Sequence, residues 1–238
     1  LCFGLLLQCK VKIMINVNSR AVIDHLVFGC DHLQYGTSYL EQRLGVGFSG
    51  GGKHTLMATH NQLLKLQDSI YFEVIAVDPE AAQEHGDICR KRWFSLDEDR
   101  TKQRLAQSPR PLTWVVAVDD IHDVTSKCGY NAGKITMMTR DDLEWLITIA
   151  DDGALIEDGL LPGFIQWPGQ QNPAFKLPES GTQLKRLILQ HPQPYAIEQI
   201  IDQLSIDGPI EVRRGTTNLI FEMQTNAGEL VSLSSAYV

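Results

Sequence analysis

The 238-residue sequence has only five cysteines, which are odd in number, widely separated and without a C-x-x-C pair. Disulfide frameworks and zinc knuckles need paired cysteines, so the sequence indicates neither. The apolar run at residues 1–7 is too short to span a bilayer and lacks the basic residues that begin a secretion signal. These absences predict a protein of the reducing cytoplasm with no membrane contact.

Positive charge is also scarce, because 21 Lys and Arg stand against 29 Asp and Glu, for a formal net charge of -8. Affinity for nucleic acid comes largely from clustered Lys and Arg. The one basic run, Arg90-Lys91-Arg92, is short and soon followed by acids, so we expect no nucleic-acid partner. Hydrophobic residues make up 43% of the chain, which is ample for a folded core.

Residues 70–77 are typical of a strand that is apolar on both faces, yet they contain one carboxylate, Glu73. Alternation along a strand places Tyr71 and Glu73 on one face and Phe72 on the other, so neither face is expected to meet water. A buried Glu is rare unless it is paired, protonated or bound to a metal. We expect His25, in the predicted strand at 21–29, to be its partner.

Three passages of the chain share the order strand, helix and then further strands. The first is expected to contain strands at 21–29, 46–49, 59–66 and 70–77 with a helix at 35–44. The second is expected to contain strands at 112–118, 145–150 and 164–167 with a helix from Ile121. The third is expected to contain strands at 184–190, 210–213, 218–225 and 229–233 with a helix at 195–204. Residues 78–111 and 168–178 are predicted connectors. We therefore expect a tail at 1–20, in which residues 1–13 precede Met14, two paired units at 21–178, and a third unit at 179–238 packed on the same domain.

Several short motifs accompany these repeated units. They are Ile23-Asp24-His25-Leu26-Val27, Gly52-Lys53-His54, Thr59-His60-Asn61, Tyr71-Phe72-Glu73 and Leu161-Pro162-Gly163-Phe164-Ile165-Gln166-Trp167. Together they resemble the glyoxalase-like domain family of the vicinal oxygen chelate superfamily, which includes glyoxalase I and the extradiol dioxygenases. The resemblance implies an α+β fold, in which two β-α-β-β-β units curl their mixed sheets into a shared cup and a third similar C-terminal unit extends it.

The resemblance also implies where metal ligands would stand, because the superfamily takes them from the first and fourth strands of each unit. The matching positions are His25 and Glu73 in the first unit and Trp114 and Gln166 in the second. Trp cannot ligate a metal and Gln is a weak donor, so only half of the ligand set is present.

His60 or His54 could complete a site with two His and one carboxylate, which suits Zn, Ni, Fe or Mn. We place His60 in this metal set with His25 and Glu73. Two other interpretations stay open: no metal, with Glu73 as a proton-abstracting base beside His25, or a static ion pair.

The remaining candidate residues are expected to contact a substrate. They are Trp114, Gln166, Trp167, His54 and Asn61. His60 and Asn61 are neighbours on one strand, so at most one can face the cup, and we favour His60. His54 follows a glycine run that is one residue short of a phosphate-binding G-x-x-x-x-G-K-[ST] loop, and we expect it in a loop, either at the substrate or at the surface.

The leading functional hypothesis is a glyoxalase-like enzyme that acts on a small molecule as a lyase or isomerase next to a carbonyl or enediolate. His25 and Glu73 are its catalytic candidates. The alternative is a non-catalytic protein of the same fold that binds or sequesters a small ligand. A structural or regulatory role is a third hypothesis. Because an odd third unit leaves an open sheet edge, a homodimer is also expected.

Overall fold

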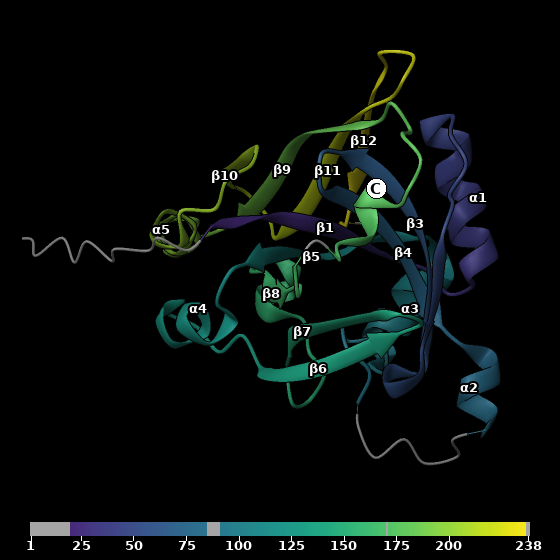
Figure 1. The fold of residues 1–238 in the computed structure, drawn as a ribbon. Coiled ribbons are helices and arrows are strands. Elements are labelled where there is room, and N and C mark those ends of the chain that lie inside the picture. Colours follow the sequence, from purple (N-terminus) through teal and green to yellow (C-terminus); the bar gives the residue numbers. More distant parts are fainter. Residues whose placement is uncertain (1–19, 85–90, 170, 237–238) are drawn as a thin grey trace, which may run out of the picture.

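The computed structural model describes residues 20–84, 91–169 and 171–236, so the predicted tail lies outside it apart from Arg20 (Figure 1). Its longer elements are, in chain order, β1 Ala21–Gly29, α1 Leu33–Leu44, β2 Gly51–His54, β3 Thr59–Gln67, β4 Ile70–Val77, α2 Pro79–Glu84, α3 Asp99–Gln107, β5 Arg110–Val118, α4 Ile121–Lys127, β6 Lys134–Arg140, β7 Leu143–Ile149, β8 Gly163–Gln166, β9 Gln183–His191, α5 Tyr195–Leu204, β10 Ile210–Arg214, β11 Asn218–Gln224 and β12 Leu230–Ser234. None of the helices in this part of the chain combines the length and the apolar character needed to cross a bilayer.

The first two β-α-β-β-β units share one mixed eight-stranded sheet, in the order β2-β3-β4-β1-β5-β8-β7-β6. Within each unit the first and last strands pair in parallel, β1 with β4 and β5 with β8, while β1 and β5 join the units in antiparallel fashion. The edge strands β2 and β6 contact each other, so the sheet curls into a nearly closed cup. The predicted α+β fold with paired units is confirmed.

The third unit follows the same order, β9-α5-β10-β11-β12, but forms a separate four-stranded sheet. This sheet covers the convex side of the larger one, where the ring centroids of Phe72 and Phe221 lie 5.9 Å apart. In Figure 1 it lies above β1, on the side away from β6 and β7. The predicted third unit is therefore present, but it packs against the outside of the cup instead of extending it.

The larger sheet is apolar on both faces because each face meets a different layer. Along β4, Phe72 and Val74 belong to the convex core against α1 and the third unit, whereas Ile75 belongs to the concave core inside the cup. Glu73 shares the concave face and is 5% exposed. The prediction of a doubly buried strand with an enclosed carboxylate is thus confirmed.

Two strand predictions for the cup are wrong. Residues 46–49 form no strand, and β2 begins instead at Gly51, which has a φ of 117°. A Cβ on Gly51 would lie 2.2 Å from the backbone oxygen of Asn61, so β2 and β3 pair only because glycine stands there. The second error is β6, which was not expected because its Lys, Thr and Met residues lack a regular apolar alternation.

Candidate active site

A β-bulge in β1 brings two consecutive polar side chains to the concave face. Ile23 pairs with Val116 and His25 with Val115, so Asp24 is an extra residue without a partner of its own on β5. A regular strand would send Asp24 and His25 to opposite faces. Because of the bulge, Asp24 and His25 contact each other while Ile23 stays in the convex core.

Asp24 is 1% exposed and binds three neighbouring groups through its carboxylate. Its Oδ1 lies 2.6 Å from Nδ1 of His25. Its Oδ2 accepts hydrogen bonds from Nε1 of Trp167 at 2.9 Å and from Nδ2 of Asn172 at 2.8 Å. A carboxylate that accepts from Nδ1–H fixes the orientation of an imidazole ring and leaves Nε2 free to act elsewhere.

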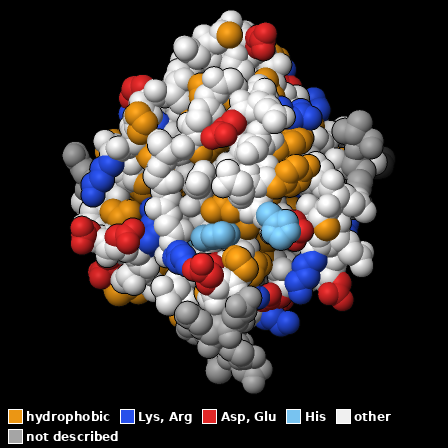
Figure 2. Space-filling view, turned by 90° about the vertical axis from the view of Figure 1, so that its right-hand side faces the viewer, with side chains coloured by type: hydrophobic (Ala, Val, Ile, Leu, Met, Phe, Trp, Pro, Cys, Tyr) orange, Lys and Arg blue, Asp and Glu red, His pale blue; other side chains and the backbone are white. Residues whose placement is uncertain are grey.

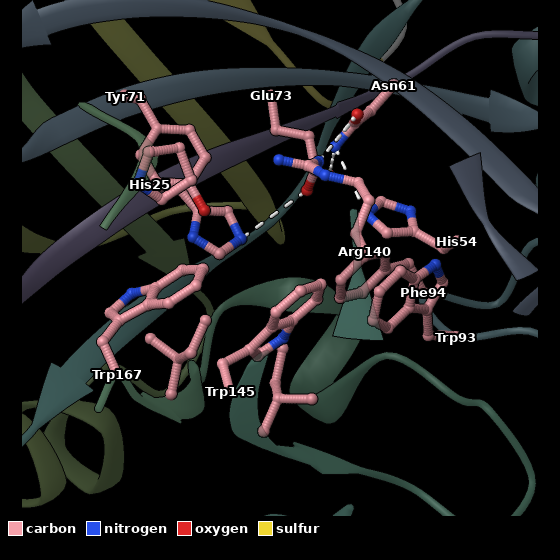
Figure 3. A pocket seen from close by; sticks show the side chains of 13 residues that line it. His25, His54, Asn61, Tyr71, Glu73, Trp93, Phe94, Arg140, Trp145 and Trp167 are labelled. Atoms are coloured by element: carbon pink, nitrogen blue, oxygen red, sulfur yellow. Dashed lines mark hydrogen bonds and ion pairs between the residues drawn. The ribbon is translucent and has the colours of Figure 1, made fainter. Parts of the chain in front are cut away.

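The free edge of His25 faces Glu73 across the cavity. Nε2 of His25 lies 3.6 Å from Oε2 of Glu73, and the ring of His25 stacks on Tyr71 with centroids 4.7 Å apart (Figure 3). The predicted spatial pairing of His25 with Glu73 is therefore present, and Tyr71 shares their face as alternation predicts.

Tyr71 remains a neutral phenol beside this pair. Burial raises the pKa of Tyr71 well above its usual value, and the carboxylates of Asp24 and Glu73 raise it further. The pair accordingly lies against a neutral, apolar ring face.

Asn61 connects Glu73 to the other unit of the cup. Its Nδ2 donates to Oε1 of Glu73, while its Oδ1 accepts from the backbone N–H of Gly52 at 2.9 Å and from Nη1 of Arg140 at 3.1 Å. Arg140 ends β6, the edge strand that contacts β2. The amide therefore holds the carboxylate and the guanidinium on one wall, as Figure 3 shows.

His54 lies at the end of β2 and is 2% exposed, so the expectation of a loop residue is corrected. Its Nδ1 lies 3.1 Å from Oγ1 of Thr59, and its ring meets the ring of Trp93 edge to face at 4.9 Å. Burial, then the charges of Arg140 and His25, lower the pKa of His54 to about 3. His54 is therefore a neutral part of the cavity wall.

Large apolar side chains close the remaining walls of the cavity. The lining residues are His25, His54, Asn61, Tyr71, Glu73, Trp93, Phe94, Arg140, Trp145, Ile147, Ile165, Trp167 and Pro173. The free volume is about 20 Å³, room for one or two water molecules. Such a narrow, buried site strengthens electrostatic interactions between the groups that line it.

Two residues of the second unit do not lie where the sequence places them. Trp114 is fully buried in the convex core and donates from Nε1 to the backbone oxygen of Leu160 at 3.0 Å. Gln166 accepts a hydrogen bond from the backbone N–H of Ile121, at the start of α4. The expectation that Trp114 and Gln166 face the cup is wrong, because the adjacent residues face it instead. Val115, next to Trp114, belongs to the concave core. On either side of Gln166, Ile165 belongs to the concave core and Trp167 lines the cavity.

His60 faces outward, which corrects its predicted place in a metal site. Of the two neighbours on β3, Asn61 lines the cavity, whereas His60 borders a surface groove together with His32. Figure 2 shows histidine side chains at the surface of this outer face. The period-two pattern of a strand allowed only one of the pair to point inward, and it is the amide that does so.

The donor set in the cup does not fit a protein-bound divalent metal. In the described ranges of the chain, His, Cys, Asp and Glu form no group of three that could hold a metal ion. Only His25 and Glu73 converge, the matching residues of the second unit, Trp114 and Gln166, do not line the cavity, and the cationic Arg140 lines the same wall. Metal sites in proteins commonly have at least three protein ligands, and a nearby cation opposes a second positive charge.

Several site residues escaped prediction from the sequence. They are Asp24, Trp93, Arg140, Trp145 and Asn172. Asp24 stands directly before His25, but the alternation rule places it on the other face unless the bulge is known. Arg140 is 79 residues from Asn61 along the chain, and no local pattern connects the two.

Comparisons with solved structures found similar proteins at low identity. A hypothetical protein from Staphylococcus aureus has a similar structure, with a TM-score of 0.56, 14% identity, and coverage of 83% of this chain and 87% of that chain. A variant of Streptomyces coelicolor methylmalonyl-CoA epimerase in complex with 2-nitronate-propionyl-CoA has a TM-score of 0.41 and 12% identity, and the match covers 62% of this chain and 98% of that chain. At these identities the likeness concerns the fold alone. A search of curated proteins found no match.

The family model gives the more direct assignment. The model described as a glyoxalase-like domain matches residues 23–205, which include both strands of the His25–Glu73 pair and most of the cup. The chain belongs to the glyoxalase-like domain family.

Proposed function

We propose that this chain is a small-molecule enzyme, an isomerase or lyase, that moves a proton at a carbon next to a carbonyl group. Membership of the glyoxalase-like domain family supports this proposal. The observation that carries it is the buried contact of His25 with Glu73, 3.6 Å from Nε2 to Oε2, inside a cavity walled by aromatic rings. A carboxylate and an imidazole enclosed together are typical of general acid–base catalysis.

In this mechanism Glu73 is the base and His25 the proton carrier. Glu73 takes the proton from the carbon next to the carbonyl, and Asn61 holds its second oxygen in place. Asp24 orients His25 so that Nε2 can exchange a proton with the substrate oxygen or with Glu73. Return of the proton to the same or the neighbouring carbon completes an isomerisation.

The metal part of the prediction is revised in this proposal. Of the expected ligands His25, Glu73 and His60, only the first two face the cavity. Zn, Ni, Fe or Mn would find two protein ligands there, so the proposed steps use side chains alone. We expect exchange activity to survive prolonged dialysis against a chelator, and elemental analysis to show far less than one metal ion per chain.

Substrate contacts are proposed for Trp167, His54 and Asn61, which line the cavity. The free volume of about 20 Å³ favours a compact substrate, because pockets for drug-sized ligands measure roughly 300–1,000 Å³. The same volume argues against the alternative of a protein that sequesters a large apolar ligand. A melting temperature that rises with aromatic ligands, without any catalysis, would favour that alternative.

Deuterium exchange tests the proposed reaction. The protein is incubated in D₂O with small uncharged carbonyl compounds, beginning with hydroxyacetone and dihydroxyacetone, and loss of the proton next to the carbonyl is followed by NMR. We expect catalysed exchange with at least one compound of this class. Glu73→Gln should lower the rate about 10²–10⁴-fold, the usual contribution of a general base.

A matched variant separates the site from a general loss of charge. Glu144→Gln removes a carboxylate from the exposed side of β7 and should leave the exchange rate unchanged. If Glu73→Gln exchanges as fast as the unmodified protein, Glu73 is not the base. The absence of exchange with every compound, together with ligand-induced stabilisation, would replace the enzyme by a binding protein.

The compartment and the oligomeric state belong to the same proposal. Cys30 and Cys128 are buried and free, which is compatible with a reducing cytoplasm. The C-terminal sheet ends in β10 on one side and β12 on the other, and a second copy could pair with such an edge. Light scattering of the purified protein would measure whether it is a homodimer.

A further inference from the structure

Arg140 is a buried cation without an anionic partner among the residues that the structure describes. It is 9% exposed and lines the cavity, and its Nη1 donates to Oδ1 of Asn61 at 3.1 Å. Its Nε is buried without a hydrogen-bond partner among the described residues. Within the same ranges, no carboxylate oxygen lies within 4.0 Å of its guanidinium nitrogens.

Such an arrangement costs stability, so it calls for an explanation. A buried charge without a close counter-ion loses its hydration without full compensation, and an unmatched N–H adds to that cost. The fold nevertheless makes room for this side chain, because a Cβ on Gly52 would lie 2.9 Å from Cδ of Arg140. A guanidinium held at such cost beside a cavity is well placed to meet a negative charge that arises during a reaction.

The proposed chemistry generates a negative charge in this cavity. Before reaction, Glu73 carries a negative charge and Arg140 a positive one, and both side chains line the same cavity. When Glu73 takes a proton from the substrate carbon, it becomes neutral. The electron pair of the broken C–H bond forms a C=C bond, and the carbonyl π pair moves to the oxygen. The charge has then moved from Glu73 to the substrate.

We propose that Arg140 is the catalytic electrophile that binds the enolate or enediolate oxygen through its guanidinium group, an inference that rests on the proposed function. Asn61 keeps the guanidinium beside Glu73. The proton moves only between the substrate and Glu73, so the total charge of Glu73, Arg140 and the substrate is unchanged throughout the step. In the reverse step Glu73 returns the proton to carbon, and the oxygen becomes a neutral carbonyl again. The substrate class is therefore an uncharged, compact carbonyl compound with a hydroxyl or an acidic hydrogen on the next carbon.

Acetate binding to a Glu73→Gln variant tests this role without any turnover. The glutamine imitates the protonated base, and acetate imitates the oxyanion, so the variant with acetate has the charges of the intermediate. We expect Glu73→Gln to bind acetate at least about tenfold more tightly than the unmodified protein, since the cavity then keeps the positive charge of Arg140 and loses the negative charge of Glu73 that repels an anion. Acetamide, which has the same shape without the charge, should bind both proteins equally weakly. Fluorescence of the cavity tryptophans reports the binding.

The double variants locate the charge that attracts acetate. Adding Arg140→Gln, which can still donate to Asn61, should remove the gain in acetate affinity. Adding Lys134→Met, which removes a charge from the exposed start of the same strand, should not. If the Glu73→Gln, Arg140→Gln protein binds acetate as tightly as Glu73→Gln alone, Arg140 has no such role.

A second measurement requires no substitution of Arg140. In Glu73→Gln labelled with ¹⁵N, acetate should shift the Nε–H resonance of Arg140 to lower field, and a resonance that does not move contradicts the inference. The outcome for the enzyme itself is separate. If exchange depends on Glu73 but persists in Arg140→Gln, only the role of Arg140 is overturned. If no exchange occurs but acetate binding depends on Arg140, the enzymatic proposal is overturned and Arg140 is left as an anion-binding group.

Discussion

At the residue scale, Asp24 holds three groups of the site in position. It binds His25, Trp167 and Asn172, which come from β1 and from the segment that follows β8. A carboxylate has enough lone pairs for all three donors, whereas an amide has one oxygen and would direct its own N–H groups at a donor. In the proposed mechanism Asp24 is therefore a positioning residue for His25, since it does not line the cavity itself.

The substitution Asp24→Asn should misorient His25 more than it unfolds the protein. We expect the exchange rate to fall about 10²-fold or more, the scale of a lost general acid or base, and the free energy of unfolding to fall by about 1–3 kcal/mol. Exchange as a function of pH and urea unfolding measure the two effects. Asp142→Asn, in the exposed turn after β6, is the control, and a wild-type pH profile in Asp24→Asn would contradict the positioning role.

His54 makes stability depend on pH in a defined direction. Its pKa is lowered from 6.5 to about 3 by burial, so between these values the unfolded chain binds a proton that the folded protein does not. Stability should therefore fall as the pH decreases below about 6.5, by up to about 1.4 kcal/mol per pH unit from this group. Above that range both states are neutral at His54 and its contribution is constant.

Urea unfolding between pH 7 and pH 4 tests this dependence. His54→Gln should reduce the slope of the free energy of unfolding against pH by up to about 1.4 kcal/mol per pH unit, which corresponds to one proton. His122→Gln, at an exposed side chain, should not change the slope. An unchanged slope in His54→Gln would show that the folded protein also protonates this ring.

At the element scale, irregular strands build the site. The bulge in β1 places Asp24 beside His25, and the glycines of β2 let its backbone approach Asn61 and Arg140 closely. Regular strands with ordinary side chains would leave these groups on different faces or too far apart. The site therefore depends on local departures from sheet geometry.

Alanine substitutions in the glycine run should have graded effects. Gly51→Ala needs a φ of 117° and a Cβ 2.2 Å from a backbone oxygen, so we expect a loss of at least about 2 kcal/mol of stability. Gly52→Ala should instead displace Arg140 and reduce exchange with a smaller loss of stability. Gly47→Ala, with its nearest contact at 3.7 Å, should change neither. Urea unfolding and the exchange assay separate these outcomes, and equal effects at all three positions would contradict the packing argument.

At the scale of the whole molecule, the third unit covers the convex core of the other two. Phe221 is fully buried between the sheets and meets Phe72 edge to face. Leu187 and Leu219 join the same cluster from the third unit. With so much shared apolar surface, we expect the two sheets to unfold together.

Two spectroscopic signals can test this cooperativity. The tryptophans all precede the third unit, and three of them, Trp93, Trp145 and Trp167, belong to the concave core. Their fluorescence therefore reports chiefly the cup, whereas circular dichroism reports both sheets. The two unfolding curves should coincide. Phe221→Ala should lower the midpoint of both by the equivalent of about 3–5 kcal/mol. Phe175→Ala, at a side chain that is 57% exposed, should shift neither, and separated curves would indicate two independent domains.

The sequence by itself determined the repeated units, the family and the Glu73–His25 partnership. Each rests on a local signal: strand and helix periodicity, short motifs, and a carboxylate in a doubly apolar strand that excludes solvent. These signals remain valid whatever the rest of the chain does, because burial of Glu73 follows from its immediate neighbours.

Only the tertiary structure decided which other side chains share the cavity. The one-residue shift of the bulge in β1 placed Asp24 beside His25. The register of β5 and β8 turned Trp114 and Gln166 away from the cavity. Closure of the cup at β2 and β6 brought Arg140 to Asn61. Side chains alternate every residue, so an error of one position in a strand reverses a face. Contacts between strands distant in sequence depend on how the whole sheet curls, and no local pattern carries that information.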